Sequence, residues 1–411
     1  MSALDIDLFD PEVQENWYSA YERLMNEAPV FQMPGTNIYV LTRYDDVYEV
    51  LRQPELYSNE HEKYGAAVLF QYQSAKDIYL EKGWRRWHPL SLDPPVQRQY
   101  RSIVDPFFRG RGLKTIEPFI RETCANLLDK IAPKGACEFV AEYAVPLPVI
   151  VITKMIGFPL EDIPQLKIWS EAWAHPFAGN LSEADEIRVA ELGVEFQHYI
   201  KDQIDQRRRA PQEDILTTLT QAKLSEGRAL SDDEIIHIAD HLYIGGNETT
   251  TFALSSGLWI MLREREIYDS LIADSSRIPA FVEEVLRLES PTQGLYRVPT
   301  EDVTLHGVTI PKGALVHLRY GAANRDPDSF ACPHALDLDR NNLKKHMAFS
   351  QGPHTCPGAA LSRLEQVISH EMMLPNLANL RLTNGRNDFT HLPGFVLRAL
   401  KELHLSFTAV A

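Results

Sequence analysis

The chain has 411 residues, of which 44% are hydrophobic and 24% are charged, an ordinary globular composition that excludes disordered and fibrous classes. Lys and Arg total 41 against 57 for Asp and Glu, and the net charge of -16 disfavours non-specific binding to nucleic acid or to an anionic membrane. The N-terminus has no secretory pattern, and the most apolar run, residues 143–158, is shorter than the ~20 residues of a membrane helix, so we expect a cytoplasmic protein without membrane or nucleic-acid partners.

Strand and helix signals are mixed at the start of the chain. Residues 31–41 contain two short apolar stretches on either side of Pro34-Gly35, a pattern that predicts a β-hairpin. Thr42-x-x-Asp45 then resembles a capping box ahead of a helical apolar stripe. We therefore expect a small sheet beside helices in this part of the chain.

Aromatic side chains accumulate between residues 60 and 92. Such a loop often lines a site, although ordinary loop packing explains the composition equally well. Asp93 and two prolines follow, and Asp93 is expected to cap a helix with proline in its first turn. That helix would place Gln97 and Arg101 one turn apart on the same face.

Residues 113–230 show mostly helical periodicity. They contain no internal repeat and no low-complexity linker. We therefore expect residues 1–411 to form a single domain.

A long helix is predicted next. Ser231-x-x-Glu234 is a capping box, and helical periodicity continues to about Arg265, a length of roughly 50 Å at 1.5 Å per residue. Its middle, residues 244–251, contains two glycines and three threonines, which cost about 2 kcal/mol or more of helix propensity. Strain there indicates either a functional kink or a close helix crossing at the glycines.

Glu284 and Arg287 share one face of a later predicted helix. Taken alone, such a pair is usually a solvated ion pair that contributes less than about 1 kcal/mol. Residues 291–298 then read as a strand.

Among the four cysteines, Cys356 has the sequence surroundings that indicate a chemical role. The other three cysteines are scattered without metal-finger spacing. Cys356 follows a loop with Gly352 and precedes Pro357, which suits a first helical position, and the helix is expected to end before Pro375. A helix N-terminus favours a thiolate, the form that binds metal, whereas a buried, inert thiol is the alternative.

The spacing of Phe349, Gly352, His354 and Gly358 around Cys356 resembles the haem-ligand loop of the cytochrome P-450 superfamily. Ser350 departs from that pattern, which has glycine there. Four further matches occur in the family order: the Asp-Pro-Pro segment with Arg101, the Gly-Gly-x-Glu-Thr segment, the Glu-x-x-Arg pair with Arg340, and Arg297.

The resemblance implies a mainly α fold with a smaller β region, in which a long central helix lies over haem b. Cys356 would be the axial metal ligand. Arg101, Arg297 and His354 would bind the propionates, Gln97 would replace the family's histidine as a weaker hydrogen-bond donor, and Phe349 would complete the haem loop. Thr249 and Glu248 would supply protons for oxygen activation.

The implied activity is a monooxygenase that inserts one atom of dioxygen into a small, mainly apolar substrate such as a terpenoid or an aromatic compound. Family correspondence places the following residues beside the haem: His241, Ile244, Gly245, Gln293, Gly294, Leu295, Val396 and Leu397. His241 and Gln293 would anchor a polar group of the substrate, or alternatively bond to neighbouring backbone.

Electrons would come from a ferredoxin of the 2Fe-2S type and its NAD(P)H-dependent reductase, because the chain contains no flavin or iron-sulfur motif. A ferredoxin would dock on these basic residues, unless they are merely scattered solvated charges: Arg98, Arg109, Arg111, Lys114, Lys344, Lys345 and Arg363. A peroxide-driven peroxygenase and a non-enzymatic haem-thiolate sensor are the alternative functions.

Overall fold

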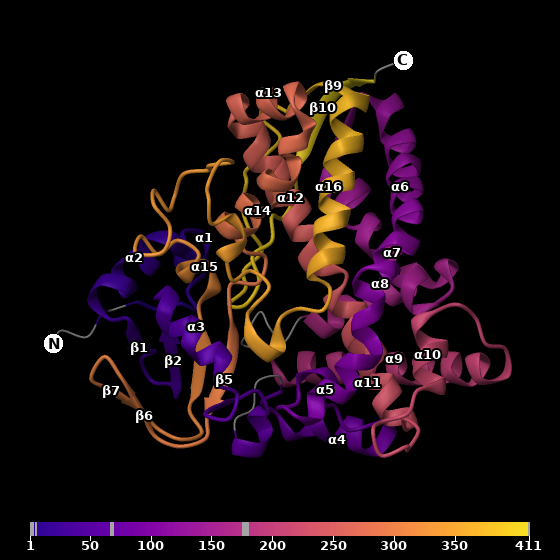
Figure 1. Ribbon diagram of the computed structural model, residues 1–411, viewed down its shortest axis with the longest axis vertical. Coiled ribbons are helices and arrows are strands. Elements are labelled where there is room, and N and C mark those ends of the chain that lie inside the picture. Colours follow the sequence, from indigo (N-terminus) through magenta and orange to yellow (C-terminus); the bar gives the residue numbers. More distant parts are fainter. Residues whose placement is uncertain (1–3, 5, 66–69, 175–180, 410–411) are drawn as a thin grey trace. The chain divides into compact units, whose positions relative to one another are not determined.

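The computed structural model describes residue 4 and residues 6–65, 70–174 and 181–409 (Figure 1). Two compact units are present, and each is composed of three separate stretches of chain. Unit 1 contains residues 1–68, 252–356 and 379–406, and unit 2 contains residues 69–251, 357–378 and 407–411. Because neither unit is a continuous piece of sequence, we propose that the chain folds as one domain.

Unit 1 holds a five-stranded sheet of order β1-β2-β8-β5-β3. The β2 and β8 strands pair in parallel, and the other neighbours are antiparallel. The strands of unit 1 are β1 (Val30–Gln32), β2 (Ile38–Leu41), β3 (Tyr57–Ser58), β5 (Leu295–Pro299), β6 (Val303–Leu305), β7 (Val308–Ile310) and β8 (Leu315–Leu318). β1 and β2 confirm the predicted hairpin, whereas the strand expected at residues 291–298 begins only at Leu295.

Unit 1 also contains helices. They are α1 (Pro11–Glu15), α2 (Trp17–Glu27), α3 (Tyr44–Arg52), α13 (Arg265–Ala273), α14 (Ile278–Glu289), α15 (Tyr320–Ala323) and the larger part of α12 (Glu248–Arg263). A buried cluster joins Leu41, Val316 and Leu318 of the sheet with Leu51 of α3 and with Met347, which lies just before the Cys356 loop. The core of unit 1 therefore fixes the start of that loop.

The capping box predicted at Thr42 is absent. The α3 helix begins at Tyr44, and its first N–H donates to Asp326 Oδ2 at 2.8 Å. A carboxylate from a distant part of the sequence therefore caps α3, and this contact has no local signal.

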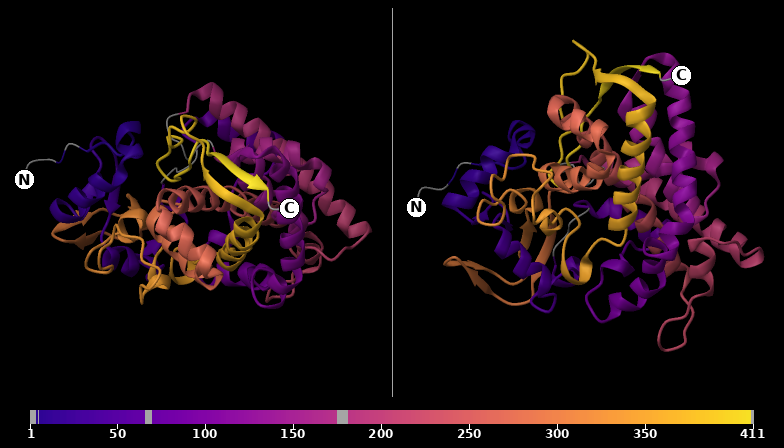
Figure 2. Two further views of the ribbon diagram at one scale, coloured as in Figure 1. Left: turned by 90° about the horizontal axis from the view of Figure 1, so that it is seen from above. Right: turned by 45° about the horizontal axis from the view of Figure 1, so that its top comes forward.

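Unit 2 is a set of packed helices. It contains α4 (Gln73–Lys82), α5 (Val96–Val104), α6 (Arg111–Ile131), α7 (Pro146–Ile156), α8 (Ile163–Ala174), α9 (Glu183–Arg209), α10 (Ile215–Gln221), α11 (Asp232–Gly245) and α16 (Ala359–Asn376). α9 packs against α4, α8, α10 and α11. α16 lies beside α6, as the yellow and purple helices show in every view (Figures 1 and 2).

Two long strands complete the fold. β10 (His404–Ala409) pairs in unit 1 with β9 (Leu377–Leu382), and Phe407 N in unit 2 donates to Gly135 O next to β4 (Ala136–Glu138). The mainly α fold with a smaller β region is thus confirmed. No helix among the described residues is long and apolar enough to cross a membrane.

Candidate functional site

The Cys356 loop is held by its own backbone. Cys356 N donates to Phe349 O at 2.9 Å, which closes the loop around the short helical turn η10 (Gly352–His354). Phe349, His354 and Cys356 are all half-buried. The α16 helix begins at Ala359 rather than at Pro357, so Cys356 precedes the helix by three residues, and the helix continues past Pro375 to Asn376.

Ser350 occupies the family's glycine position with a φ of 59°. This left-handed conformation costs a residue with a Cβ roughly 1–2 kcal/mol. Tyr320 donates its hydroxyl to Ser350 Oγ at 3.3 Å, which offsets part of that cost. The departure is therefore accommodated without loss of the turn.

Gly352 allows the loop to approach α3 closely. Its φ is +71°, and a Cβ there would lie 2.4 Å from Leu51 O. We expect Gly352→Ala to lower the free energy of unfolding by about 3 kcal/mol, because left-handed strain adds to a backbone clash. Gly35 is a matched control, since its φ is +72° and nothing lies within 4 Å of the added Cβ.

Gly35→Ala should cost only about 1 kcal/mol, the conformational part alone. Urea unfolding followed by circular dichroism measures both variants. Equal destabilisation by the two substitutions would contradict the close approach of the loop to Leu51.

Two other cysteines are unsuited to be thiolates. Burial raises the pKa of Cys124 to about 12 and the pKa of Cys137 to about 12. Both thiols therefore stay protonated at neutral pH and behave as small apolar side chains. Cys332 is exposed and lies outside the loop.

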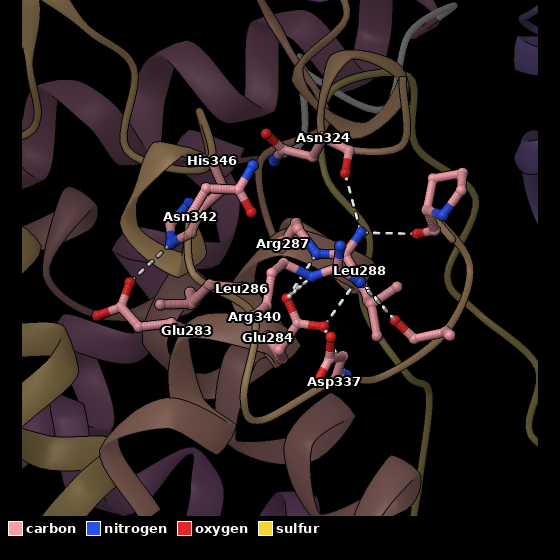
Figure 3. Close-up of polar contacts among 12 residues, drawn as sticks. Glu283, Glu284, Leu286, Arg287, Leu288, Asn324, Asp337, Arg340, Asn342 and His346 are labelled. Atoms are coloured by element: carbon pink, nitrogen blue, oxygen red, sulfur yellow. Dashed lines mark hydrogen bonds and ion pairs between the residues drawn. The ribbon is translucent and has the colours of Figure 1, made fainter. Parts of the chain in front are cut away.

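A buried charge network lies just ahead of the cysteine loop in the sequence (Figure 3). Arg287 Nε donates to Glu284 Oε1 at 2.6 Å, and Arg340 Nε donates to the same oxygen at 3.1 Å. The Glu284 and Arg287 side chains are fully buried. The predicted pair is thus part of a network rather than a solvated pair on the surface.

Other hydrogen bonds of Arg287 go to main-chain oxygens. Arg287 donates to the carbonyls of Asn324, Pro333 and Ala335. Asn324 Oδ1 accepts from Met347 N at 2.6 Å, and His346 contacts Glu283 at 2.8 Å (Figure 3). The network therefore ties together the backbone that leads into the Cys356 loop.

Arg297 lies on β5 and is 2% exposed. Its Nη1 donates to Asn59 Oδ1 at 2.9 Å and to Tyr296 O at 2.7 Å. These contacts fix the position of the guanidinium.

The structure brings the predicted pocket residues of unit 1 together. Gln293 N donates to Val396 O at 2.7 Å, and a β-bridge joins Thr292 to Leu397. A Cβ on Gly294 would lie 2.2 Å from Leu318 O, so glycine is required there. Leu295 is more exposed than its neighbours, at 38%.

The Gln293 amide is already satisfied within unit 1. Nε2 donates to Glu289 O and Ser290 O, and Oε1 accepts from Tyr21 Oη. Bonding to neighbouring backbone, the alternative for this side chain, is therefore the arrangement that the structure has.

Gln97 and Arg101 share the buried face of α5, as predicted. Arg101 Nε donates to Asp105 Oδ1 at 2.6 Å. The helix begins at Val96 with no side-chain cap, so the two prolines precede the helix instead of forming its first turn. Asp93 is therefore not the predicted cap.

The predicted long helix is interrupted. The capping box of Ser231 and Glu234 is present at the start of α11, but α11 ends at Gly245 and α12 begins at Glu248. A Cβ on Gly246 would lie 2.8 Å from Ile152 Cγ1, whereas a Cβ on Gly245 would meet nothing within 4 Å. The lack of a side chain at Gly246 therefore allows close packing against Ile152. Gly245 is exposed, and space is open beside it, although most of α11 is buried.

The three threonines that follow differ in role. Thr249 Oγ1 donates to Gly245 O at 3.2 Å, at the interruption. Thr250 donates to Ser362 of α16, and Thr251 donates to Ala144 O. Only Thr249 therefore presents its hydroxyl beside the open turn.

Glu248 forms an ion pair that the sequence did not reveal. Lys167 Nζ of α8 lies 3.2 Å from Glu248 Oε1, and the Glu248 side chain is 12% exposed. Lys167 thereby fixes the position of the Glu248 carboxylate. No local pattern links residues 81 positions apart, so only the folded chain shows this pair.

His241 and Ile244 lie on α11 before the open turn. Burial lowers the pKa of His241 to about 4, with Arg86 and Arg101 adding to the effect, so the ring is neutral near pH 7. Its Nδ1 has no hydrogen-bond partner among the described residues. Arg86 lies in the aromatic-rich segment before α5. In the sequence, these aromatic neighbours are the only indication that Arg86 lies near a functional site.

Comparisons with known proteins agree with these features. Residues 181–404 match the family Cytochrome P450. The steroid C26-monooxygenase of Mycobacterium tuberculosis is 30% identical over 412 residues, which cover 99% of this chain and 98% of that protein.

Solved structures give the same result. P450BioI in complex with an acyl carrier protein ligated to hexadec-9Z-enoic acid has a TM-score of 0.87 and 30% identity, over 96% of this chain and 100% of that chain. Cytochrome P450 CREJ in complex with (4-ethylphenyl) dihydrogen phosphate has a TM-score of 0.88 and 26% identity, over 99% of each chain.

Proposed function

The chain belongs to the cytochrome P450 family and is a P450 monooxygenase, and from this premise we propose its cofactor, electron donor and working residues. The cofactor is haem b, the oxidant is dioxygen, and the electrons come from a separate ferredoxin and its NAD(P)H-dependent reductase. The observation that carries the proposal is the Cys356 loop, closed by the hydrogen bond from Cys356 N to Phe349 O. It presents a half-buried thiol in a chain whose buried thiols are inert.

The donor set fits haem. A soft thiol suits iron, and the buried guanidiniums of Arg101 and Arg297 suit two carboxylates. The open turn at Gly245 leaves room for a flat group or a substrate. Cys356 would hold the iron, and these residues would hold the rest of the haem: Gln97, Arg101, Arg297, Phe349 and His354.

Bound through a thiolate, haem supplies oxygen activation, because thiolate donation favours cleavage of the O–O bond over simple carriage. Thr249 and Glu248 supply the protons in this proposal. Lys167 keeps the Glu248 carboxylate in place at 3.2 Å, and Gly245 O holds the Thr249 hydroxyl at 3.2 Å. Both residues lie in the first turn of α12, beside the open turn at Gly245.

The substrate is a small organic molecule with an apolar body. The residues proposed to contact it in unit 2 are Ile244, Gly245 and, as a polar group, His241, and those proposed in unit 1 are Gly294, Leu295, Val396 and Leu397. Gln293 supports the backbone of this pocket, because its amide is bonded elsewhere.

Substrate-dependent oxidation of NADH tests the proposed monooxygenase activity. With a ferredoxin and its reductase, a substrate that shifts the haem spin state should raise NADH oxidation several-fold and yield an oxygenated product. A sensor would show no product. A peroxygenase would form product from hydrogen peroxide alone, with no need for the electron donors.

Exposed basic residues support docking of an acidic ferredoxin. Arg98, Arg109, Arg111 and Lys114 are exposed in unit 2, Arg363 is half-buried there, and Lys344 and Lys345 are exposed in unit 1. Charge reversal at Arg109 and Arg111 should slow ferredoxin-driven reduction about 10-fold at low ionic strength, and less at high ionic strength.

Lys130→Glu is the matched control for this docking face. Lys130 is exposed near the far end of α6 from Arg111, roughly 28 Å away at 1.5 Å per residue. Stopped-flow reduction should be unchanged in this control. Equal rates for the reversed and the wild-type proteins at every ionic strength would remove this surface from the proposal.

A further inference from the structure

Arg86 is a buried cation that forms no ion pair in the described part of the chain. Its exposure is 9%, and none of its guanidinium nitrogens has a hydrogen-bond partner among the residues that the structure describes. Burial of an unpaired charge is strongly unfavourable, so an unpaired buried arginine in a folded protein needs an explanation.

The other buried arginines do not share this property. Each of them donates at least one hydrogen bond to a side chain or to the backbone: Arg101, Arg207, Arg287, Arg297, Arg319, Arg325, Arg340 and Arg398. Arg86 is the exception among the described residues. Its donors are therefore available to a group that is not part of this chain.

Aromatic rings hold the Arg86 guanidinium in place. Its central carbon lies 4.5 Å from the ring centroid of Trp173 and 5.9 Å from that of Phe70. Phe70 and Tyr79 belong to one buried cluster between α4 and α9. Contact with ring faces stabilises the cation but leaves the N–H groups at its edge unpaired, oriented for a planar acceptor.

The neighbouring polar groups do not neutralise Arg86. Asp240 contributes a carboxyl, but burial raises its pKa although Arg86 lowers it, and the two form no ion pair among the described residues. His241 is neutral, and its Nδ1 also lacks a partner in the described part of the chain. Burial raises the pKa of the Tyr79 hydroxyl and Arg86 lowers it, through its charge and a side-chain contact, but a neutral hydroxyl does not neutralise the guanidinium.

We propose that Arg86 is the anion-binding group of the substrate site, so that the substrate carries an oxyanion, a carboxylate or a phosphate, at one end of an apolar body. The N–H edge of Arg86 binds two oxygens of that group, and Trp173 and Phe70 keep the guanidinium plane fixed. His241, one of the proposed pocket residues, lies nearby in unit 2, because the His88 ring contacts both His241 at 5.2 Å and Trp173 at 6.1 Å between ring centroids. This inference rests on the proposed monooxygenase function and names its substrate class.

Binding of matched probes to the haem-loaded protein tests the proposal. One set is 4-ethylbenzoate, 4-ethylphenyl phosphate and the neutral 4-ethylbenzamide, and a second pair is decanoate and decanamide. Calorimetry and the spin-state shift of the Soret band report affinity. We expect an oxyanion probe to bind at least 10-fold more tightly than its neutral isostere, and the benzoate and phosphate arms distinguish the two oxyanions.

Arg86→Met should abolish that preference while the affinity for the neutral probe changes less than threefold. Arg86→Lys keeps the charge without the planar fork, so it should retain part of the preference. Arg85→Met is the control, because Arg85 is adjacent and exposed, and it should leave every affinity unchanged.

Two outcomes would overturn the proposal. One is a wild-type protein that prefers the oxyanion in no matched set, and this result does not depend on any variant. The other is an Arg86→Met protein that loses haem but retains the preference, which would assign Arg86 to the cofactor's carboxylates. Failure of the monooxygenase function itself is separate, since it would appear as loss of the thiolate signature before any probe is added.

Discussion

Glu284→Gln should lower the free energy of unfolding by about 3–5 kcal/mol, the range for removal of one partner from a buried ion pair. Glu284 accepts from Arg287 and Arg340 and also from Asp337 N at 2.9 Å. Glutamine keeps the size of the side chain but removes the charge, so two buried guanidiniums lose their counter-ion. Urea unfolding of the haem-loaded protein, with haem retention measured in parallel, gives the effect.

Asp269→Asn provides the matched comparison. Asp269 pairs with Arg265 at 3.2 Å one helical turn away, but both side chains are more than half exposed. Solvent screens such a pair, and its loss should cost no more than about 0.5 kcal/mol. If both substitutions cost the same, the Glu284 network does not stabilise the backbone ahead of the Cys356 loop.

Thr249→Ala should lower the fraction of electrons that reach product by about 10-fold and divert them into hydrogen peroxide, the scale of a lost proton-transfer group. Thr249 is the threonine whose hydroxyl lies at the open turn, 3.2 Å from Gly245 O. The ratio of product to NADH consumed, with peroxide measured separately, gives the result.

Thr249→Ser keeps the hydroxyl and should restore most of the coupling. Thr250→Ala removes a buried hydroxyl that bonds to Ser362 at 3.0 Å, so it should cost about 1 kcal/mol of stability without uncoupling. Undiminished coupling in Thr249→Ala would reject the relay role, and uncoupling in Thr250→Ala would indicate a general disturbance of the helix.

Local patterns predicted the features that local chemistry determines. The Pro34-Gly35 hairpin and the Ser231 capping box are present because adjacent residues supply every partner. The poor helix propensity of residues 244–251 indicated strain in the predicted long helix, but the break between Gly245 and Glu248 was not predicted. The structure then divides the two explanations for the strain: Gly246 makes a close crossing with Ile152, and Gly245 leaves an open turn.

Contacts between distant residues were beyond sequence reasoning. Asp326 caps α3 in place of Thr42, and Lys167 pairs with Glu248 across two helices. The side chain of Arg86 gave no signal beyond its aromatic surroundings, because the absence of a partner is a property of the packed interior. These are also the residues for which the structure adds most to the proposed mechanism.

The most direct measurement is the absorption spectrum of the purified protein, reduced with dithionite and exposed to carbon monoxide. Haem held by the Cys356 thiolate predicts a strongly red-shifted Soret band that disappears in Cys356→Ser. A band typical of nitrogen ligation, or a protein that binds no haem, would contradict the assignment of Cys356 and the monooxygenase mechanism built on it.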